Sequence, residues 1–248
     1  MAVGRTQSRW YFNGQREYVA SRSVFAGARC VTFDPFGDFE IRGYLRNFAS
    51  LKDISQVKDL EYASFQGNLS RAINALANID FIEYKHVLAI HQTLFGDVYP
   101  WAGQDRLLTA QNINISKGGY RAMFAQPPYI RRVTDYALDL GRDPNVMRER
   151  PGHIMGSLAH AHPFLDGNGR TIMVIHSELA YRAGISINWG QTDKTDYLMA
   201  LTKELNDPDK GHLDLYLKPF IRDAVERQRS ASVLKSLKGL GETTIGEE

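Results

Sequence analysis

The sequence predicts an all-α domain. Apolar side chains recur at helical spacing over most of the 248 residues, beginning near residue 54. Between Trp101 and Tyr129 this period disappears and short alternating runs replace it, which predicts one small hairpin. With 43% hydrophobic and 23% charged residues, the chain is long enough and apolar enough for one sizeable core.

Two predicted helices precede the hairpin. The first covers residues 54–77, where the apolar side chains lie on one face of an amphipathic helix. The second covers residues 81–95, and we expect Asp80 to be its N-cap and Gly96 to end it. Within it, His91 is expected to be a surface or partly buried polar residue.

Three predicted helices follow the hairpin. The pair Pro127-Pro128 opens the first of them, and Gly141 is expected to close it. Pro151 starts the next helix, which runs to His162. A third helical pattern covers residues 171–181. The second and third helices flank the stretch that carries the predicted chemistry.

The two ends of the chain have a different character. Residues 10–40 mix aromatic residues with Gly and Arg without a firm period, so we expect residues 1–42 to form an irregular arm packed on the core. Helical spacing resumes near the C-terminus and continues up to Pro219. Residues 224–248 are expected to form a tail that projects from the core or leads into a region absent from this chain.

Charge and cysteine content exclude several classes of partner and site. The formal net charge of +2 favours neither a nucleic-acid partner nor an anionic membrane surface. The single cysteine, Cys30, excludes an internal disulfide and fits a reducing compartment. The N-terminus lacks the apolar stretch of a secretory signal, and no run of about eighteen apolar residues occurs. We therefore expect a cytoplasmic protein, with export by a non-Sec route left open.

Nine consecutive residues concentrate the chemistry of the chain: His162-Pro163-Phe164-Leu165-Asp166-Gly167-Asn168-Gly169-Arg170. Proline restricts the residue before it to extended conformations, so the preceding helix should end at His162 and leave its imidazole exposed. Phe164 is expected to be a buried anchor. Asp166 opens a turn whose two glycines permit positive φ. A helix begins where the glycines end.

A glycine turn that leads into a helix forms an anion site, because its free N–H groups and the positive end of the helix dipole face the same point. The N–H groups of Gly167, Asn168 and Gly169 are therefore predicted to bind phosphate. Arg170 would add a bidentate phosphate contact. Asp166 is suited to hold Mg²⁺ against the same phosphates.

His162 supplies a base beside this phosphate site. An unperturbed imidazole has a pKa near ~6.5, so it accepts a proton at neutral pH. The nine residues contain neither Ser nor Cys, so we expect an external hydroxyl, activated by His162, to be the nucleophile. Residue types alone thus predict metal-assisted transfer of a phosphate-containing group.

A zinc site is the competing interpretation of the same histidines, because His160 and His162 are followed by Asp166. A His-x-His pair diverges on a helix, however, and no cysteine or second spaced pair completes four ligands. We therefore interpret His160 as a helix residue near the site.

The nine residues resemble the signature of the Fic family, His-Pro-Phe-x-(Asp/Glu)-Gly-Asn-Gly-Arg-x-x-Arg. Eight of its nine specified residues match, and the ninth, an arginine, is replaced by Met173. The segments 99–104 and 114–119 resemble the family's stretch before the active site and its target-docking flap. The resemblance covers roughly residues 43–223, which we predict to be the Fic domain.

The resemblance implies an all-helical core with a small hairpin flap over the active site. It implies transfer of AMP from ATP, with Mg²⁺, to a Ser, Thr or Tyr hydroxyl of a target protein. The implied catalytic residues are His162, Asp166, Asn168 and Arg170. The implied nucleotide-binding residues are Gly167, Asn168, Gly169, Arg170 and Tyr197. The implied flap residues, which would hold the target as an added strand, are Asn112, Ile113, Asn114, Ile115, Ser116 and Lys117.

Two alternatives accompany this hypothesis. Some Fic-like proteins transfer another nucleotide or a phospho-group, and a catalytically impaired nucleotide-binding interaction module is the other possibility. Retention of His162, Asp166 and Asn168 favours activity over the impaired module.

Met173 bears on regulation. Many family members are inhibited by a glutamate that pairs with the final motif arginine, within a Ser/Thr-x-x-x-Glu-Gly/Asn helix. No glutamate in this chain precedes Gly or Asn, so a separate small antitoxin-like protein, or no inhibition, is expected. An arginine at position 173 is predicted to tighten ATP binding, and core packing is the alternative role of Met173.

Overall fold

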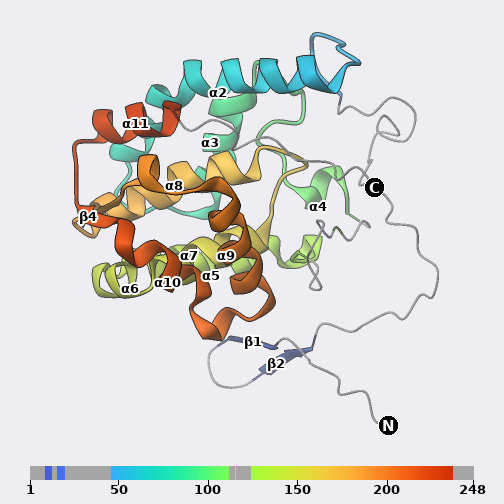
Figure 1. Ribbon diagram of the computed structural model, residues 1–248. Coiled ribbons are helices and arrows are strands. Elements are labelled where there is room, and N and C mark those ends of the chain that lie inside the picture. Colours follow the sequence, from blue (N-terminus) through green and yellow to red (C-terminus); the bar gives the residue numbers. More distant parts are fainter. Residues whose placement is uncertain (1–8, 13–15, 20–45, 112–114, 116–123, 237–248) are drawn as a thin grey trace.

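The computed structural model describes residues 9–12, 16–19, 46–111, 115 and 124–236, and it confirms the predicted all-α fold (Figure 1). The helices are α2 (Ile54–Ala77), α3 (Tyr84–Phe95), α4 (Arg106–Thr109), α5 (Ile130–Arg142), α6 (Pro144–Glu149), α7 (Pro151–Ala161), α8 (Asn168–Arg182), α9 (Lys194–Asn206), α10 (His212–Leu217) and α11 (Arg227–Ser236). Short 3₁₀ turns cover Pro127–Tyr129, Trp189–Gln191, Pro208–Lys210 and Lys218–Phe220. None of the described helices is both long and apolar enough to cross a membrane.

Two small antiparallel sheets accompany the helices. Strand β1 (Arg9–Phe12) pairs with β2 (Arg16–Val19), and β3 (Ile185–Ile187) pairs with β4 (Ile221–Asp223). The prediction of an irregular arm over residues 10–40 is therefore wrong for the residues of β1 and β2. The dipeptide Asn13-Gly14 between these strands is a common hairpin signal in a sequence. Strands β3 and β4 have three residues each, too few to produce a visible alternation.

Helix α7 is the buried centre of the fold. All its side chains are buried except that of His160, and it contacts α5, α8, α9 and α10. Helix α8 packs beside α7, and α2 and α3 contact α8 as well (Figure 1). The loop between α7 and α8, residues 162–167, is therefore held at the ends of two helices that the core fixes on several sides.

The predicted bounds of the early helices are largely confirmed. Helix α2 has the bounds expected from its apolar face, and its N-cap Asp53 accepts a bond from the Gln56 N–H at 3.1 Å. Helix α3 ends at Gly96 as predicted, but its predicted N-cap, Asp80, is wrong. The helix begins after Glu83, whose N–H donates to His86 Nδ1 at 2.9 Å. This local bond fixes a later start than the sequence pattern indicated.

Other features correct the prediction after residue 100. Helix α4 lies within the stretch where no helical period was visible, because a single helical turn is too short to show one. Gly141 does not close α5, which continues to Arg142. A Cβ at Gly141 would lie 2.7 Å from Leu179 Cδ1, so this glycine serves close packing between α5 and α8.

The predicted C-terminal tail does not project from the core between residues 227 and 236. Helix α11 buries Ala231 and Leu234 in the main core cluster. Arg227 Nε donates to Glu178 Oε2 on α8 at 2.8 Å, and its guanidinium lies 4.0 Å from the centre of the Tyr181 ring. The predicted domain bounds, 43 and 223, stay predictions.

The contact between α7 and α10 generates a stability prediction. A Cβ on Gly152 would lie 2.3 Å from the backbone N of Asp214 and the backbone C of Leu213, and backbone cannot easily yield. We expect Gly152→Ala to lower the free energy of unfolding by about 1–3 kcal/mol, as overpacking does. Gly67→Ala is the matched control, because Gly67 is an exposed position within α2 with nothing within 4 Å of its added Cβ.

Gly67→Ala should stabilise the protein by about 0.5–1 kcal/mol, since alanine has less backbone entropy to lose in a helix. Urea unfolding followed by circular dichroism measures both changes. Equal effects of the two substitutions would contradict the close approach of α7 and α10.

Candidate active site

The loop begins with a left-handed residue. His162 has φ 41° and ψ 61°, so the prediction of an extended backbone before Pro163 is wrong. The left-handed conformation commonly ends a helix, and here that requirement prevails over the proline preference. The His162 side chain is half-buried where full exposure was expected, because its ring stacks on Phe124 with centroids 3.9 Å apart.

Arg106 holds this unusual conformation in place. Its Nε donates to the His162 carbonyl at 2.7 Å, and its Nη2 donates to the Ala125 carbonyl at 2.6 Å. Its backbone N–H donates to the Pro163 carbonyl at 2.7 Å. Burial lowers the pKa of Arg106 to about 10, which leaves the guanidinium charged at neutral pH. No sequence pattern distinguished this buried arginine from an ordinary surface residue.

A second anchor lies under the middle of the loop. Phe164 is fully buried, as predicted, and its ring stacks on His91 at 3.7 Å. His91 Nδ1 accepts the Gly103 N–H at 2.9 Å, so Nε2 carries the proton and donates to the Asp166 carbonyl at 3.0 Å. Burial lowers the pKa of His91 to about 3, which keeps the ring neutral. The expectation of a surface or partly buried histidine is wrong.

The turn uses one of its two glycines for a positive φ. Gly167 has φ 75° and precedes the first residue of α8. A Cβ on Gly167 would lie 2.6 Å from Phe95 Cε2 and 3.1 Å from His91 Nε2, so glycine is required for space as well as for conformation. Gly169 lies inside α8 and is exposed, and it does not use the positive φ that a glycine permits.

Asn168 ties the loop to itself. Its Oδ1 accepts the Phe164 N–H at 2.8 Å, and its Nδ2 donates to the Phe164 carbonyl at 2.8 Å. The side chain is thus buried in the loop's own hydrogen bonds. The first intrahelical bond of α8 runs from Thr171 N to Gly167 O, so the N–H groups of residues 168–170 precede it. These are the groups that a helix start offers to an anion.

Four charged side chains form a chain of alternating sign beside the loop. Asp166 Oδ2 lies 2.7 Å from Lys58 Nζ, which lies 2.9 Å from Glu61 Oε2. The same Glu61 oxygen lies 3.1 Å from Arg170 Nη2, and Tyr99 donates its hydroxyl to Glu61 Oε1 at 2.6 Å. We call Lys58, Glu61, Asp166 and Arg170 the charge cluster. Its formal charges sum to zero.

The charge cluster determines the ionisation of Asp166. Burial alone would raise the pKa of Asp166, but the Lys58 ammonium and the Arg170 guanidinium hold it well below its usual value. Arg170 is buried, with its guanidinium 4.6 Å from the centre of the Phe95 ring. Lys58 and Glu61 were not singled out from the sequence, because charged residues are ordinary on an amphipathic helix and only the fold brings α2 to this loop.

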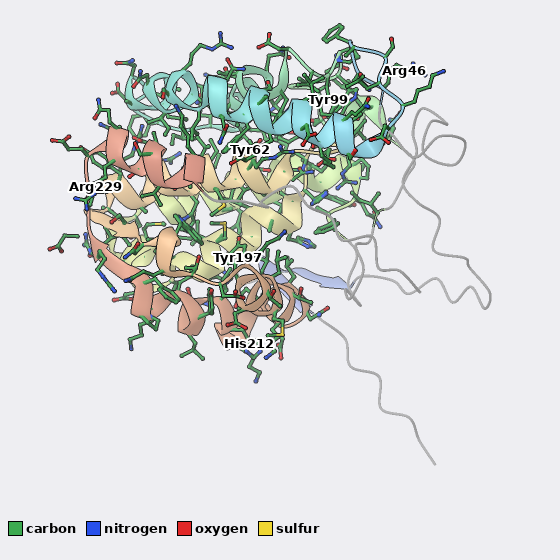
Figure 2. All side chains as sticks on the ribbon, turned by 45° about the horizontal axis from the view of Figure 1, so that its top comes forward. Arg46, Tyr62, Tyr99, Tyr197, His212 and Arg229 are labelled. Atoms are coloured by element: carbon green, nitrogen blue, oxygen red, sulfur yellow. The ribbon has the colours of Figure 1, made fainter. Side chains whose placement is uncertain are left out.

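The remaining predicted residues lie in several places. Met173 is 2% exposed and part of the main core, which favours packing over the phosphate-facing position that the sequence suggested. Tyr197 on α9 meets the Trp189 ring edge-on at 5.6 Å, near Tyr216. In Figure 2, Tyr99 lies near α2, whereas Tyr197 lies among the C-terminal helices. The contact of Tyr197 with nucleotide stays a prediction.

Most of the predicted flap lies outside the described residues: Asn112, Ile113, Asn114, Ser116 and Lys117. Ile115 is buried, and its carbonyl accepts the Phe124 N–H at 3.2 Å. Phe124 is the residue that stacks on His162. Ile115, the described residue of the predicted flap, is therefore connected to His162 through Phe124.

The donor set around the loop bears on the choice of metal. In the described part of the chain, no group of three or more His, Cys, Asp or Glu side chains could hold a metal ion. His160 faces Arg106, and burial followed by that charge lowers its pKa to about 4. Mg²⁺ is commonly held by one or two carboxylates together with phosphate oxygens and water. Asp166, beside the start of α8, fits that pattern.

Three histidines with lowered pKa values generate a pH prediction. Burial lowers the pKa of His91 to about 3 and of His160 and His176 to about 4, from 6.5. Their folded pKa values lie below the unfolded value, so the unfolded chain binds more protons in this range. Their contribution to stability is complete above about pH 6.5 and is lost as the pH falls toward 4.

Urea unfolding between pH 8 and pH 4 tests this. We expect His91→Gln to show a shallower loss of stability with falling pH than the wild type, because one proton-linked group is gone. His212→Gln, at a partly exposed histidine on α10, is the control and should keep the wild-type slope. A wild-type slope in the His91 variant would show that His91 binds the same number of protons in the folded and the unfolded chain, which would contradict its lowered pKa.

Comparisons with known proteins agree with this geometry. A model of the Fic/DOC family matches residues 81–180, which include the whole loop. The protein adenylyltransferase VbhT of Bartonella schoenbuchensis is 32% identical over 168 residues, which are 67% of this chain and 35% of that protein. This chain therefore spans about a third of the length of that relative. The probable protein adenylyltransferase y4lH of Sinorhizobium fredii is 30% identical over 171 residues, covering 65% of this chain and 83% of y4lH.

Solved structures share the fold. The BepC protein of Bartonella tribocorum, solved with AMPPNP, matches with a TM-score of 0.61 at 22% identity. The match covers 73% of this chain and 93% of the BepC chain. The N-terminal Fic domain of a Bep effector from Bartonella quintana, solved with ADP, matches with a TM-score of 0.62 at 20% identity. The match covers 77% of this chain and 96% of that domain's chain. The family model matches the residues around the loop, and y4lH is a relative at 30% identity of which this chain covers 83%. The chain therefore belongs to the Fic/DOC family.

Proposed function

We propose that this chain is a protein adenylyltransferase, which transfers AMP from ATP to a Ser, Thr or Tyr hydroxyl of a target protein. The observation that carries the proposal is the loop from His162 to Arg170, which sets a half-buried imidazole at the start of α8. The relatives named protein adenylyltransferases support it.

His162 acts as the general base in this proposal. Its ring accepts the proton of the target hydroxyl while the hydroxyl oxygen attacks the α-phosphorus of ATP. The bond between the α-phosphorus and the bridging oxygen breaks, and pyrophosphate leaves with that oxygen. Stacking on Phe124 and the bond from Arg106 to the His162 carbonyl hold the ring in a defined position.

The start of α8 stabilises the charge that develops on phosphate. The N–H groups of residues 168–170 and the positive end of the helix dipole provide fixed positive potential. Asp166 would hold Mg²⁺, which neutralises phosphate charge when bound. Asn168 acts through its side chain as a positioning residue, since both of its polar atoms bond the Phe164 backbone.

The target protein would dock on the flap, residues 112–117, by strand addition. The hydrogen bond from the Phe124 N–H to the Ile115 carbonyl supports this, because Ile115 belongs to the predicted flap and the Phe124 ring stacks on His162. A separate small inhibitory protein, a cytoplasmic location and export by a non-Sec route stay predictions.

His162→Ala is expected to reduce target labelling by ~10²–10⁴-fold, the usual effect of losing a general base. Nucleotide affinity should be nearly unchanged, because the imidazole acts on the incoming hydroxyl. The measurement is incubation with bacterial and eukaryotic lysates and ATP labelled at the α-phosphate or at the γ-phosphate. His212→Ala is the control.

Label retained from the α-phosphate and not from the γ-phosphate identifies nucleotidyl transfer. Label from the γ-phosphate alone would overturn the proposal in favour of phosphoryl transfer. Nucleotide binding by the wild type without any labelled band would favour the impaired binding module.

Arg106 is expected to be a positioning residue for His162. Arg106→Lys keeps a charge but cannot reproduce the bonds to two carbonyls, so labelling should fall by about 10²-fold, as small misplacements of catalytic groups do. The affinity for AMPPNP should change little, which separates misplacement from loss of the nucleotide site. Arg131→Met, at an exposed arginine paired with Asp135, is the matched control. Equal losses of labelling and affinity would contradict the positioning role.

A further inference from the structure

Each carboxylate oxygen of Asp166 has a partner within the described part of the chain. Its Oδ1 accepts the Gly167 N–H at 2.6 Å, and its Oδ2 pairs with Lys58 Nζ at 2.7 Å. The ammonium therefore pairs with the oxygen that does not accept the Gly167 N–H. It competes with a metal ion for that oxygen, because it occupies one lone pair and places a positive charge beside it.

The ion pairs of the charge cluster differ in burial. The side chains of Lys58 and Asp166 are 24% and 29% exposed, whereas those of Arg170 and Glu61 are 3% and 0% exposed. Partly exposed pairs contribute little to stability and exchange easily, whereas breaking a buried pair leaves an uncompensated charge. Of the two contacts, the one between Lys58 and Asp166 is the one that can open.

Lys58 keeps a second partner when it leaves Asp166. Glu61 Oε2 lies 2.9 Å from Lys58 Nζ, three residues further along α2. Glu61 is itself fixed by the Tyr99 hydroxyl and by Arg170. The ammonium is therefore tethered beside the site and remains paired whichever way it turns.

We propose that Lys58 is a tethered cation that occupies the metal-binding oxygen of Asp166 and exchanges with the metal of the nucleotide. This rests on the proposed function, in which Asp166 holds that metal. In the absence of metal, Lys58 neutralises a carboxylate that would otherwise repel phosphate. In its presence, Lys58 is a competitor that lowers the affinity of Asp166 for the metal.

Two titrations test the exchange, with Mn²⁺ as the metal probe and AMPPNP as the nucleotide. Calorimetry in EDTA measures the affinity for metal-free AMPPNP. Electron paramagnetic resonance of free Mn²⁺ measures metal affinity with and without AMPPNP. Lys58→Met removes the cation, Lys58→Arg retains it, and Lys85→Met removes an exposed lysine paired with Glu83 outside the charge cluster.

We expect effects of opposite sign in Lys58→Met. Mn²⁺ should bind about fivefold more tightly, and metal-free AMPPNP should bind about fivefold more weakly, the scale of a partly exposed ion pair. Lys58→Arg and Lys85→Met should stay close to the wild type in both titrations. General damage to the fold would weaken both affinities together. A higher affinity for Mn²⁺ combined with a lower affinity for metal-free AMPPNP is therefore specific to exchange.

Weaker Mn²⁺ binding in Lys58→Met, or unchanged Mn²⁺ binding, would overturn the proposal. Loss of both affinities would show that Lys58 is a direct phosphate contact or a structural residue. Failure of the wild type to bind AMPPNP under any condition would overturn the proposed function instead, and the Mn²⁺ titration without nucleotide would still compare the variants.

Discussion

The active-site loop depends on a backbone conformation that its own residues disfavour. His162 is a non-glycine residue in the left-handed region and precedes a proline, and such conformations cost about 1–3 kcal/mol. Buried groups on both sides compensate for that cost. Arg106 bonds the His162 and Pro163 carbonyls, and the stacked rings of His91 and Phe164 fix the following turn. The position of His162 is therefore determined by α3 and α4 as much as by the loop.

The helices and the loop could be predicted because their signals are local. The period of apolar residues located α2 with its correct bounds, and the glycine turn located the start of α8. Predictions failed where one local rule competed with another. The proline preference at His162 yielded to the helix end, and a short capping bond moved the start of α3 from Asp80 to Glu83. Gly169 lies within α8, so it does not use the positive φ that a glycine permits.

The polar groups that support the site could not be predicted, because each is distant in sequence from the loop. Lys58 and Glu61 reach it from α2, and Arg106 reaches it from α4. In a sequence such residues look like solvated charges, which charged side chains on helices usually are. Their burial and pairing follow from helix packing alone. The burial of Met173 likewise depends on which face of α8 meets the core.

The packing of α11 has a consequence for how small the catalytic unit can be. A chain shortened at residue 223 would retain every residue of the loop, yet it would lose Leu234 and Ala231 from the core. It would also leave Glu178, a buried carboxylate on α8, with Arg182 as its remaining arginine partner in place of two. Since α8 begins at the glycine turn after Asp166, removing this distant helix would loosen the element that orients the candidate site. A self-sufficient fragment must therefore extend through Ser236.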